Sequence, residues 1–68
     1  MSLKSKHHLE RILIYEYFNI EDCLEESLYK ESYLNYFCDN NNFSYEKNII
    51  LDPLKNIYHI IVKLYTYE

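Results

Sequence analysis

Glycine, alanine, glutamine and tryptophan are absent from the 68 residues of this chain, and proline occurs once. Phosphate-binding loops need glycine so that the backbone can approach the ligand closely, and its absence excludes a P-loop and a glycine-rich dinucleotide fingerprint. The residues that are abundant, Asn, Ile, Tyr and Lys, have AT-rich codons and indicate an AT-rich genome rather than a function. At this length the chain forms at most one domain.

Cysteine is also scarce, with two residues in the chain. Cys23 and Cys38 fall within one predicted helix, where a rise of about 1.5 Å per residue separates them by roughly 22 Å and prevents a bond between them. Two cysteines without a secretory signal do not make a disulfide framework. We therefore expect reduced core thiols and an intracellular, cytoplasmic protein. No apolar run approaches the length of a membrane span.

The charge balance argues against nucleic acid as a partner. The net charge is −4 and the isoelectric point is about 5.3, whereas nucleic-acid binding needs a basic surface. The positive charges lie near the start of the chain, at Lys4, Lys6 and Arg11, beside His7 and His8. We interpret this group as the solvated start of a helix.

No group of residues has the pattern of a catalytic or metal site. His7 and His8 are adjacent, and no Cys-x-x-Cys or His-x-x-x-His spacing occurs, so we predict no metal site. The carboxylate pairs Glu21/Glu25 and Asp22/Glu26 have helical spacing, but catalytic pairs need a cleft, and we interpret them as a solvated acidic face or a docking face for a basic partner. The predictions are no enzyme activity, no catalytic residues and no cofactor.

The first part of the chain admits two interpretations. Residues 1–5 are expected to be flexible, and from Lys6 the apolar residues follow helical spacing through Leu9, Ile12 and Leu13. A strand over Ile12–Phe18 competes, because β-branched and aromatic residues are crowded there.

A second helix is predicted from Ile20 to about Cys38. Asn19 is its expected N-cap, and Glu21 and Asp22 suit the positive end of the helix dipole. Tyr29, Tyr33 and Tyr36 share one side and are interpreted as an edge of the core, with a protein interface as the alternative. Its expected apolar side comprises Leu24, Leu28, Leu34 and Phe37, with Cys23, Tyr33 and Cys38.

The rest of the chain is predicted to be a loop and two more helices. Asp39–Asn42 is the expected loop, in which Asn takes the left-handed conformation that glycine usually provides. Ser44 is expected to cap a short helix through Leu51, and Asp52-Pro53 to begin the last helix, with Asp as N-cap and Pro at the first helical position.

The predicted last helix is apolar over most of its circumference. Its stripe comprises Leu54, Ile57, Tyr58, Ile61, Leu64 and Tyr65, and Ile60 and Val62 lie off it. A helix of this kind is normally enclosed on several sides, which three helices in 68 residues cannot achieve. The predicted fold is therefore all-α, a small bundle of three to four helices forming a single helical domain over residues 1–68, completed by homo-oligomerisation.

Several short motifs fit a known helical family. They are Leu9-Glu10-Arg11-Ile12-Leu13, Tyr33-Leu34-x-x-Phe37, Phe43-Ser44-x-Glu46, Ile49-Ile50-Leu51-Asp52-Pro53 and Tyr58-x-x-x-Val62. Together they resemble the N-terminal half of the BART domain, the helical fold of an Arf-like GTPase binder and of related ciliary proteins. The resemblance implies a protein-binding adaptor, with an Arf-like GTPase as partner.

A second resemblance points to self-association. Leu13-Ile14-x-x-Tyr17-Phe18, Glu31-Ser32 and Pro53-Leu54 look like the LisH-type dimerisation domain of FOP-related centrosomal proteins. This similarity implies a dimerisation module of a centrosomal or ciliary protein.

The leading hypothesis is a protein–protein interaction module that lays an amphipathic helix of its partner into an apolar groove. We expect the last helix to form that groove, because it has an excess of apolar residues. The candidate partner-binding residues are Ile57, Ile60, Ile61 and Leu64. Core packing or an oligomer seam is the alternative role for all four.

Overall fold

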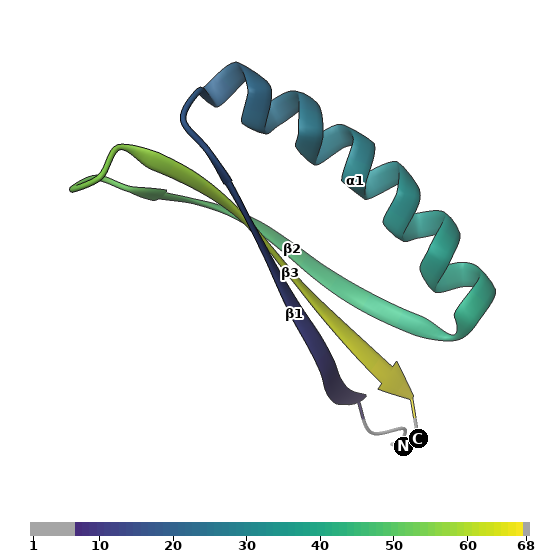
Figure 1. Cartoon of the computed structure of the whole chain (residues 1–68). Coiled ribbons are helices and arrows are strands. Elements are labelled where there is room, and N and C mark those ends of the chain that lie inside the picture. Colours follow the sequence, from purple (N-terminus) through teal and green to yellow (C-terminus); the bar gives the residue numbers. More distant parts are fainter. Residues whose placement is uncertain (1–6, 68) are drawn as a thin grey trace.

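A computed structural model describes the backbone of residues 7–67 and contains three strands and one helix in that range (Figure 1). The elements are β1 (His7–Tyr17), α1 (Ile20–Asn41), β2 (Phe43–Asp52) and β3 (Ile57–Tyr67). This is a mixed α/β fold, so the predicted all-α bundle of three to four helices, and with it the helical domain, is wrong. The predicted flexible residues 1–5, together with Lys4 and Lys6, lie outside the described residues.

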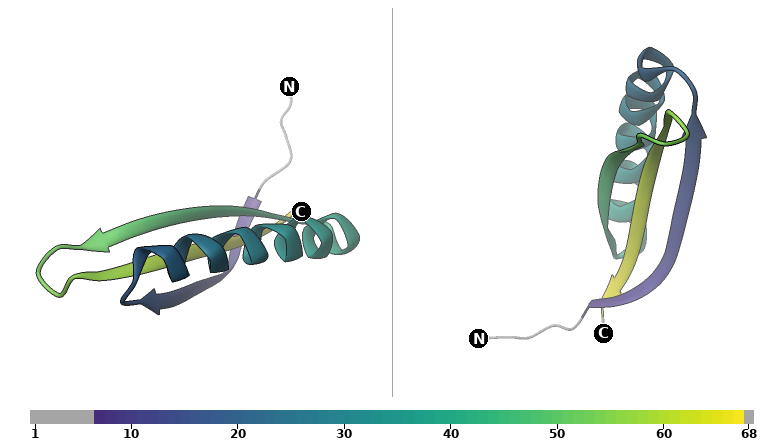
Figure 2. Two further views of the ribbon diagram at one scale, coloured as in Figure 1. Left: turned by 90° about the horizontal axis from the view of Figure 1, so that it is seen from above. Right: turned by 90° about the vertical axis from the view of Figure 1, so that its left-hand side faces the viewer.

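The sheet has the strand order β1-β3-β2, with β3 antiparallel to both neighbours. The strands β1 and β2 are therefore parallel to each other, and α1 connects them across one face while β3 fills the gap between them. This is a split β-α-β arrangement followed by a hairpin. The two views of Figure 2 show α1 on a single face of the sheet.

The strand β3 replaces the predicted last helix. Ile60, Val62 and Leu64 are buried on the face that meets α1, whereas Ile61 and Lys63 alternate onto the opposite face. This is the period-2 pattern of a strand, in a segment rich in β-branched residues. The segment is apolar on both sides because it is the central strand of the sheet. Its excess of apolar residues therefore does not indicate a helix that must be enclosed, and the predicted last helix is wrong.

At the start of the chain, the strand interpretation is the correct one. Leu13, Tyr15 and Tyr17 pack against the core, whereas Ile12 and Ile14 point to the opposite face and are exposed. The helix predicted from Lys6 is therefore wrong in the described residues. A β-bulge between Leu9 and Arg11 interrupts the pairing of β1 with β3.

A four-residue turn replaces the predicted start of the last helix. The Asp52 carboxylate accepts hydrogen bonds from the backbone N–H groups of Leu54 (3.0 Å) and Lys55 (3.3 Å), as an N-cap would. The N–H of Asn56 then donates to the Asp52 carbonyl at 2.7 Å, and Asn56 adopts a left-handed φ of 57° that reverses the chain. The short helix predicted over Ser44–Leu51 is likewise wrong, because this segment belongs to β2.

The predicted second helix is confirmed, with the expected N-cap. The Asn19 side chain accepts from the backbone N–H groups of Glu21 (2.7 Å) and Asp22 (3.2 Å). At the other end, Asn42 has a left-handed φ of 59°, and its N–H donates to the Cys38 carbonyl. Asparagine thus takes the role that glycine usually has at a helix C-terminus.

The helix ends later than predicted, because the first three residues of the expected loop, 39–41, are helical. The side-chain amides of Asn40 and Asn41 donate to the backbone carbonyls of Tyr36 (2.7 Å) and Phe37 (2.8 Å), one turn earlier. These bonds extend α1 through three residues that have low helix propensity.

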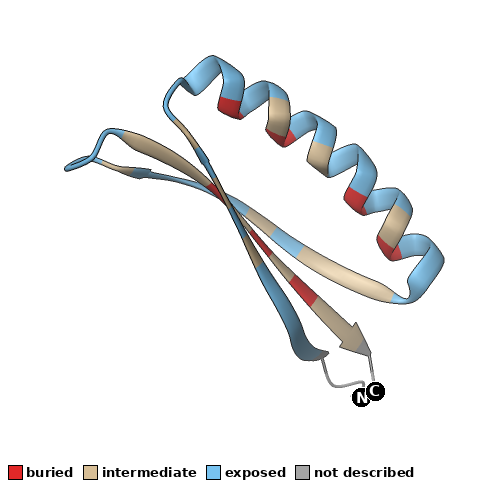
Figure 3. Cartoon of the chain, in the orientation of Figure 1, coloured by how far each residue is buried: buried red, intermediate tan, exposed pale blue. Residues whose placement is uncertain are grey.

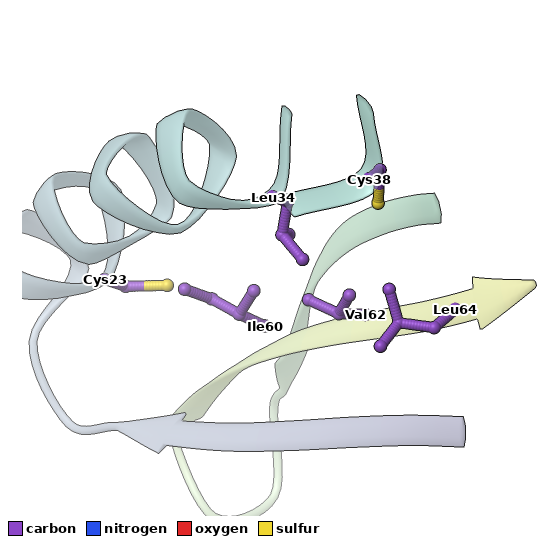
Figure 4. Close-up of a cluster of buried hydrophobic side chains, with 6 residues drawn as sticks. All are labelled: Cys23, Leu34, Cys38, Ile60, Val62 and Leu64. Carbon is purple, nitrogen blue, oxygen red and sulfur yellow. The ribbon is translucent and has the colours of Figure 1, made fainter. Parts of the chain in front are cut away.

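The core is a single layer between α1 and β3. Figure 4 shows Cys23, Leu34 and Cys38 of α1 facing Ile60, Val62 and Leu64 of β3, and Figure 3 shows how few positions are buried. The two cysteines lie on one helix, buried and unpaired, as predicted. Three residues of its expected apolar side, Leu24, Leu28 and Tyr33, are instead exposed.

Candidate interaction surface

Among the described residues, more large hydrophobic side chains are exposed than are buried. The exposed ones form two main groups. One lies on the face of the sheet that α1 does not cover, which we call the open face, and the other lies on the outer side of α1. Contiguous exposed apolar surface on a small protein marks a site of association.

The apolar part of the open face is centred on the β1 side. Ile14 pairs with Ile61 across the sheet, and Ile12, next but one along β1, pairs with Lys63. Ile14 is 60% exposed and Ile12 is 47% exposed. These residues form an apolar strip that reaches the edge of the sheet at β1.

Polar pairs bound this strip. The Glu16 carboxylate lies 3.3 Å from Nε2 of His59, and the Tyr65 hydroxyl donates to the Glu46 carboxylate at 3.3 Å. Burial raises the pKa of Tyr65, and the negative charge of Glu46 and this hydrogen bond raise it further. An apolar strip with a polar rim is the usual anatomy of a protein interface.

The two edges of the sheet differ in how they are protected. On β2, Lys47 points toward α1, where its Nζ donates to the Ser27 carbonyl (3.0 Å) and lies 3.6 Å from the Glu31 carboxylate. An inward-pointing charge of this kind discourages further strand pairing. The middle of β1, residues 12–15, has no charged residue and no proline. β1 is therefore the edge better suited to receive another strand.

The helix is bonded more closely to the β2 side than to the β1 side. Besides the bonds of Lys47, the Tyr45 hydroxyl donates to the Asn35 side chain at 2.7 Å. Burial raises the pKa of Tyr45, and the charges of Glu31 and Cys38 add to the increase. On the β1 side, Lys30 Nζ lies 3.8 Å from the ring centroid of Tyr15 in a cation–π interaction.

Aromatic rings line the β1 side of α1. The Tyr33 and Phe37 rings stack at 5.9 Å, and those of Phe37 and Phe43 stack at 5.4 Å. A shallow groove beside this stack separates the end of α1 from the start of β1. Its lining comprises Glu10, Arg11, Phe37, Phe43 and Leu64.

The predicted partner-binding residues do not share one surface. Ile60 and Leu64 are buried against α1, whereas Ile57 and Ile61 are half-buried and alternate onto the open face. The structure therefore separates the four residues into two pairs on opposite sides of β3.

Other predicted features lie on the outside of the molecule. Tyr29, Tyr33 and Tyr36 are exposed on α1, so their interpretation as an edge of the core is wrong, and their role in an interface stays a prediction. The carboxylates of the first turns of α1 are also exposed.

Ile12 and Ile14 were not among the candidate residues. Residues 12–17 do not alternate apolar with polar side chains, so the pattern does not say which face is exposed; the strand interpretation would only have placed Ile12 and Ile14 on one face and Leu13 on the other.

In residues 7–67, no three or more His, Cys, Asp or Glu side chains are grouped so that they could hold a metal ion. Within the same range, no helix combines the length and the apolar character that crossing a membrane requires.

Comparison of the chain with protein-family models, with curated proteins and with solved structures finds no match. The resemblances to the BART and LisH-type domains therefore stay predictions. The BART-like motifs include residues 9–13 of β1, 43–52 of β2 and 58–62 of β3, and the LisH-like motifs include residues 13–17 of β1, all of which form strands here.

Proposed function

We propose that this chain is a non-enzymatic protein-interaction module whose uncovered apolar surfaces are completed by another polypeptide. The observation that carries the proposal is the excess of exposed over buried large hydrophobic side chains in the described residues. A domain of this size buries only about 60% of the surface of its unfolded chain, so a partner that covers the remainder stabilises it.

The geometry favours strand addition as the mode of binding. β3 has a neighbour on each side, whereas β1 has a free edge whose backbone N–H and C=O groups are available to an added strand. An added strand gains affinity from main-chain hydrogen bonds and specificity from side chains that alternate between the two faces.

An Arf-like GTPase remains a predicted partner, and self-association remains the alternative. The proposal no longer uses a groove on a last helix, because the segment that was to form it is the central strand of the sheet. A GTPase partner would instead have to engage the β1 edge, the open face or the tyrosines of α1.

Chemical cross-linking of the tagged chain in cells tests the proposal. The wild type should give a defined species of higher mass, and Ile14→Lys on β1 should remove it, because a charge then occupies the apolar strip. Leu54→Lys is the matched control, since Leu54 lies on the hairpin turn and is 96% exposed. A cross-linking pattern identical in the wild type and in Ile14→Lys contradicts the proposed use of this surface.

A further inference from the structure

We propose that β1 pairs antiparallel with β1 of a second copy of this chain, about a two-fold axis at Leu13, to form a continuous six-stranded sheet. The inference rests on the proposed function and assigns its partner. It follows from three observations: the difference between the two sheet edges, the symmetry of the residues along β1, and the position of α1.

The first observation is that the middle of β2 carries an inward-pointing charge, whereas the middle of β1 does not and the β-bulge of β1 lies near one end. On β2, Lys47 is turned inward and held by Ser27 and Glu31. On β1, the four residues Ile12 to Tyr15 are uncharged. An unprotected edge with apolar side chains on both faces is a template for pairing with another chain.

The second observation is that β1 is self-complementary about Leu13. Directly opposed residues of an antiparallel pair lie on the same face of the sheet. An axis at Leu13 places Leu13 against its own copy, Ile12 against Ile14, and Arg11 against Tyr15 of the second copy. Each of these pairs is apolar or brings a guanidinium beside an aromatic ring, which is favourable.

Neighbouring registers lack this match. An axis at Ile14 would place Ile12 against Glu16 of the second copy, and Glu16 already lies beside His59. With the axis at Leu13 the next pair would be Glu10 against Glu16, but Glu10 is the extra residue of the bulge between Leu9 and Arg11, which ends regular pairing there. A two-fold axis makes the contact isologous, so that each favourable pair occurs twice.

The third observation is that, among the described residues, α1 makes its hydrogen bonds to the sheet on the β2 side and not on the β1 side. The axis is perpendicular to the sheet, so the two helices lie on the same face, each bonded to its own β2 through residues such as Tyr45 and Lys47. The half-buried side chains of Leu13, Tyr15 and Tyr17 lie between them. Tyr33, which stacks on Phe37 on the β1 side of α1, can cover these residues in both copies.

The side chains at the β1 edge supply part of the area that a dimer needs. Taking about 200 Å² for a tyrosine and about 100 Å² for an aliphatic side chain, the exposed parts of Ile12, Ile14 and Tyr33 amount to about 230 Å² in each copy. A stable interface needs about 1,000–1,200 Å² in total, so the remainder has to come from the backbone of β1 and from the half-buried Leu13, Tyr15 and Tyr17.

The first test is solution mass by light scattering over a concentration series, with circular dichroism to confirm folding. The wild type should be a dimer. Ile14→Lys should raise the dimer dissociation constant by about a hundredfold, because each copy loses one apolar contact and two lysines come close together. The matched control is Ile50→Lys on β2, which changes the same residue type at 49% exposure on the same face and should remain dimeric.

The second test fixes the register and does not depend on the folding of a lysine variant. Leu13→Cys should form an intermolecular disulfide under mild oxidation, because the two Leu13 positions are directly opposite. Ile14→Cys should not, because its copies are diagonal neighbours at about 7–8 Å. The native Cys23 and Cys38 are buried, which keeps them out of the reaction.

Three outcomes overturn the inference: a wild type that is monomeric throughout the series, dissociation of Ile50→Lys to the same extent as Ile14→Lys, or cross-linking of Ile14→Cys in preference to Leu13→Cys. A monomer that still gives a cross-linked species of higher mass in cells, lost in Ile14→Lys, refutes the second copy and leaves the proposed function standing. A monomer with no such species refutes both.

Discussion

Ile60 and Ile61 are adjacent residues of the same type that lie on opposite faces of β3, and they provide a direct test of the fold. Ile60 is 0% exposed and packs between the sheet and α1, whereas Ile61 is only half-buried on the open face. In the strand, truncation of the two residues should have very different costs. In the helix originally predicted, Ile61 lies on the apolar stripe and Ile60 off it, so the order would be reversed.

The expected magnitudes follow from burial. Ile60→Ala removes a fully buried side chain and leaves a cavity, which costs about 3–4 kcal/mol of unfolding free energy. Ile61→Ala removes a half-buried side chain beside solvent and leaves no closed cavity, so its cost is about 1 kcal/mol. The total stability of a domain of this length is about 3–10 kcal/mol, and Ile60→Val, at about 1 kcal/mol, is the milder companion change.

Urea unfolding followed by far-ultraviolet circular dichroism measures these costs, with all variants at one protein concentration. Equal losses for the two alanine variants, or a larger loss for Ile61→Ala, would refute the alternation on which the fold depends. Ile60→Asp should unfold the chain, because it introduces a carboxylate at a fully buried position.

Two further predictions concern a backbone position and the cysteines. Asn42→Ala should lower the unfolding free energy by about 1 kcal/mol in thermal unfolding, because alanine is strained at the left-handed φ of 59°. Asn42→Gly should leave the unfolding free energy unchanged or raise it. Equal values for both variants would contradict the role of Asn42 as the left-handed cap of α1. Burial raises the pKa of the Cys23 and Cys38 thiols above the ordinary value of 9.0, with the charge of Asp39 adding to the effect at Cys38. The folded state therefore holds these protons more tightly, a contribution that is complete below about pH 9 and is lost as the pH rises through the folded pKa. Unfolding free energy should fall above pH 9, and more steeply than in a Cys23→Ala/Cys38→Ala variant; parallel profiles would show that the thiols do not contribute.

The helix could be predicted from the sequence because its signals are local. Asn19 accepts from N–H groups two and three residues ahead, and acidic residues occupy the first turn, so the cap identifies the start of α1 without knowledge of the rest of the fold. The end was misplaced because asparagine serves equally as a helix residue bonded to the preceding turn and as a left-handed cap. Asn41 and Asn42 take these two roles in succession.

The strands could not be fixed in the same way. Residues 57–65 are apolar at positions that satisfy both the helical and the alternating period, and the choice depends on partners distant in sequence, such as Ile14 for Ile61. Asp52 makes the same bonds at the start of a turn as at the start of a helix, and only the left-handed Asn56, three residues beyond Pro53, separates the two outcomes.

The predicted partner-binding residues are affected by the same wrong assignment of residues 57–65 to a helix. Choosing one helical face grouped Ile57 and Ile61 with Ile60 and Leu64, which the pleat of β3 places on opposite sides. β-Branched residues are dense in both terminal segments and favour a strand in the last segment as much as in the first.

The position of β3 also has a consequence for how this protein is made. The last strand in the chain is the middle strand of the sheet, and it supplies Ile60, Val62 and Leu64, half of the buried core. As the ribosome synthesises the chain, β1, α1 and β2 emerge before the strand that joins them, so neither edge strand has a neighbour and the inner face of α1 has nothing to pack on. Folding must therefore await the completion of the final strand, and a nascent chain that stalls before it presents its apolar segments to chaperones or to other nascent chains.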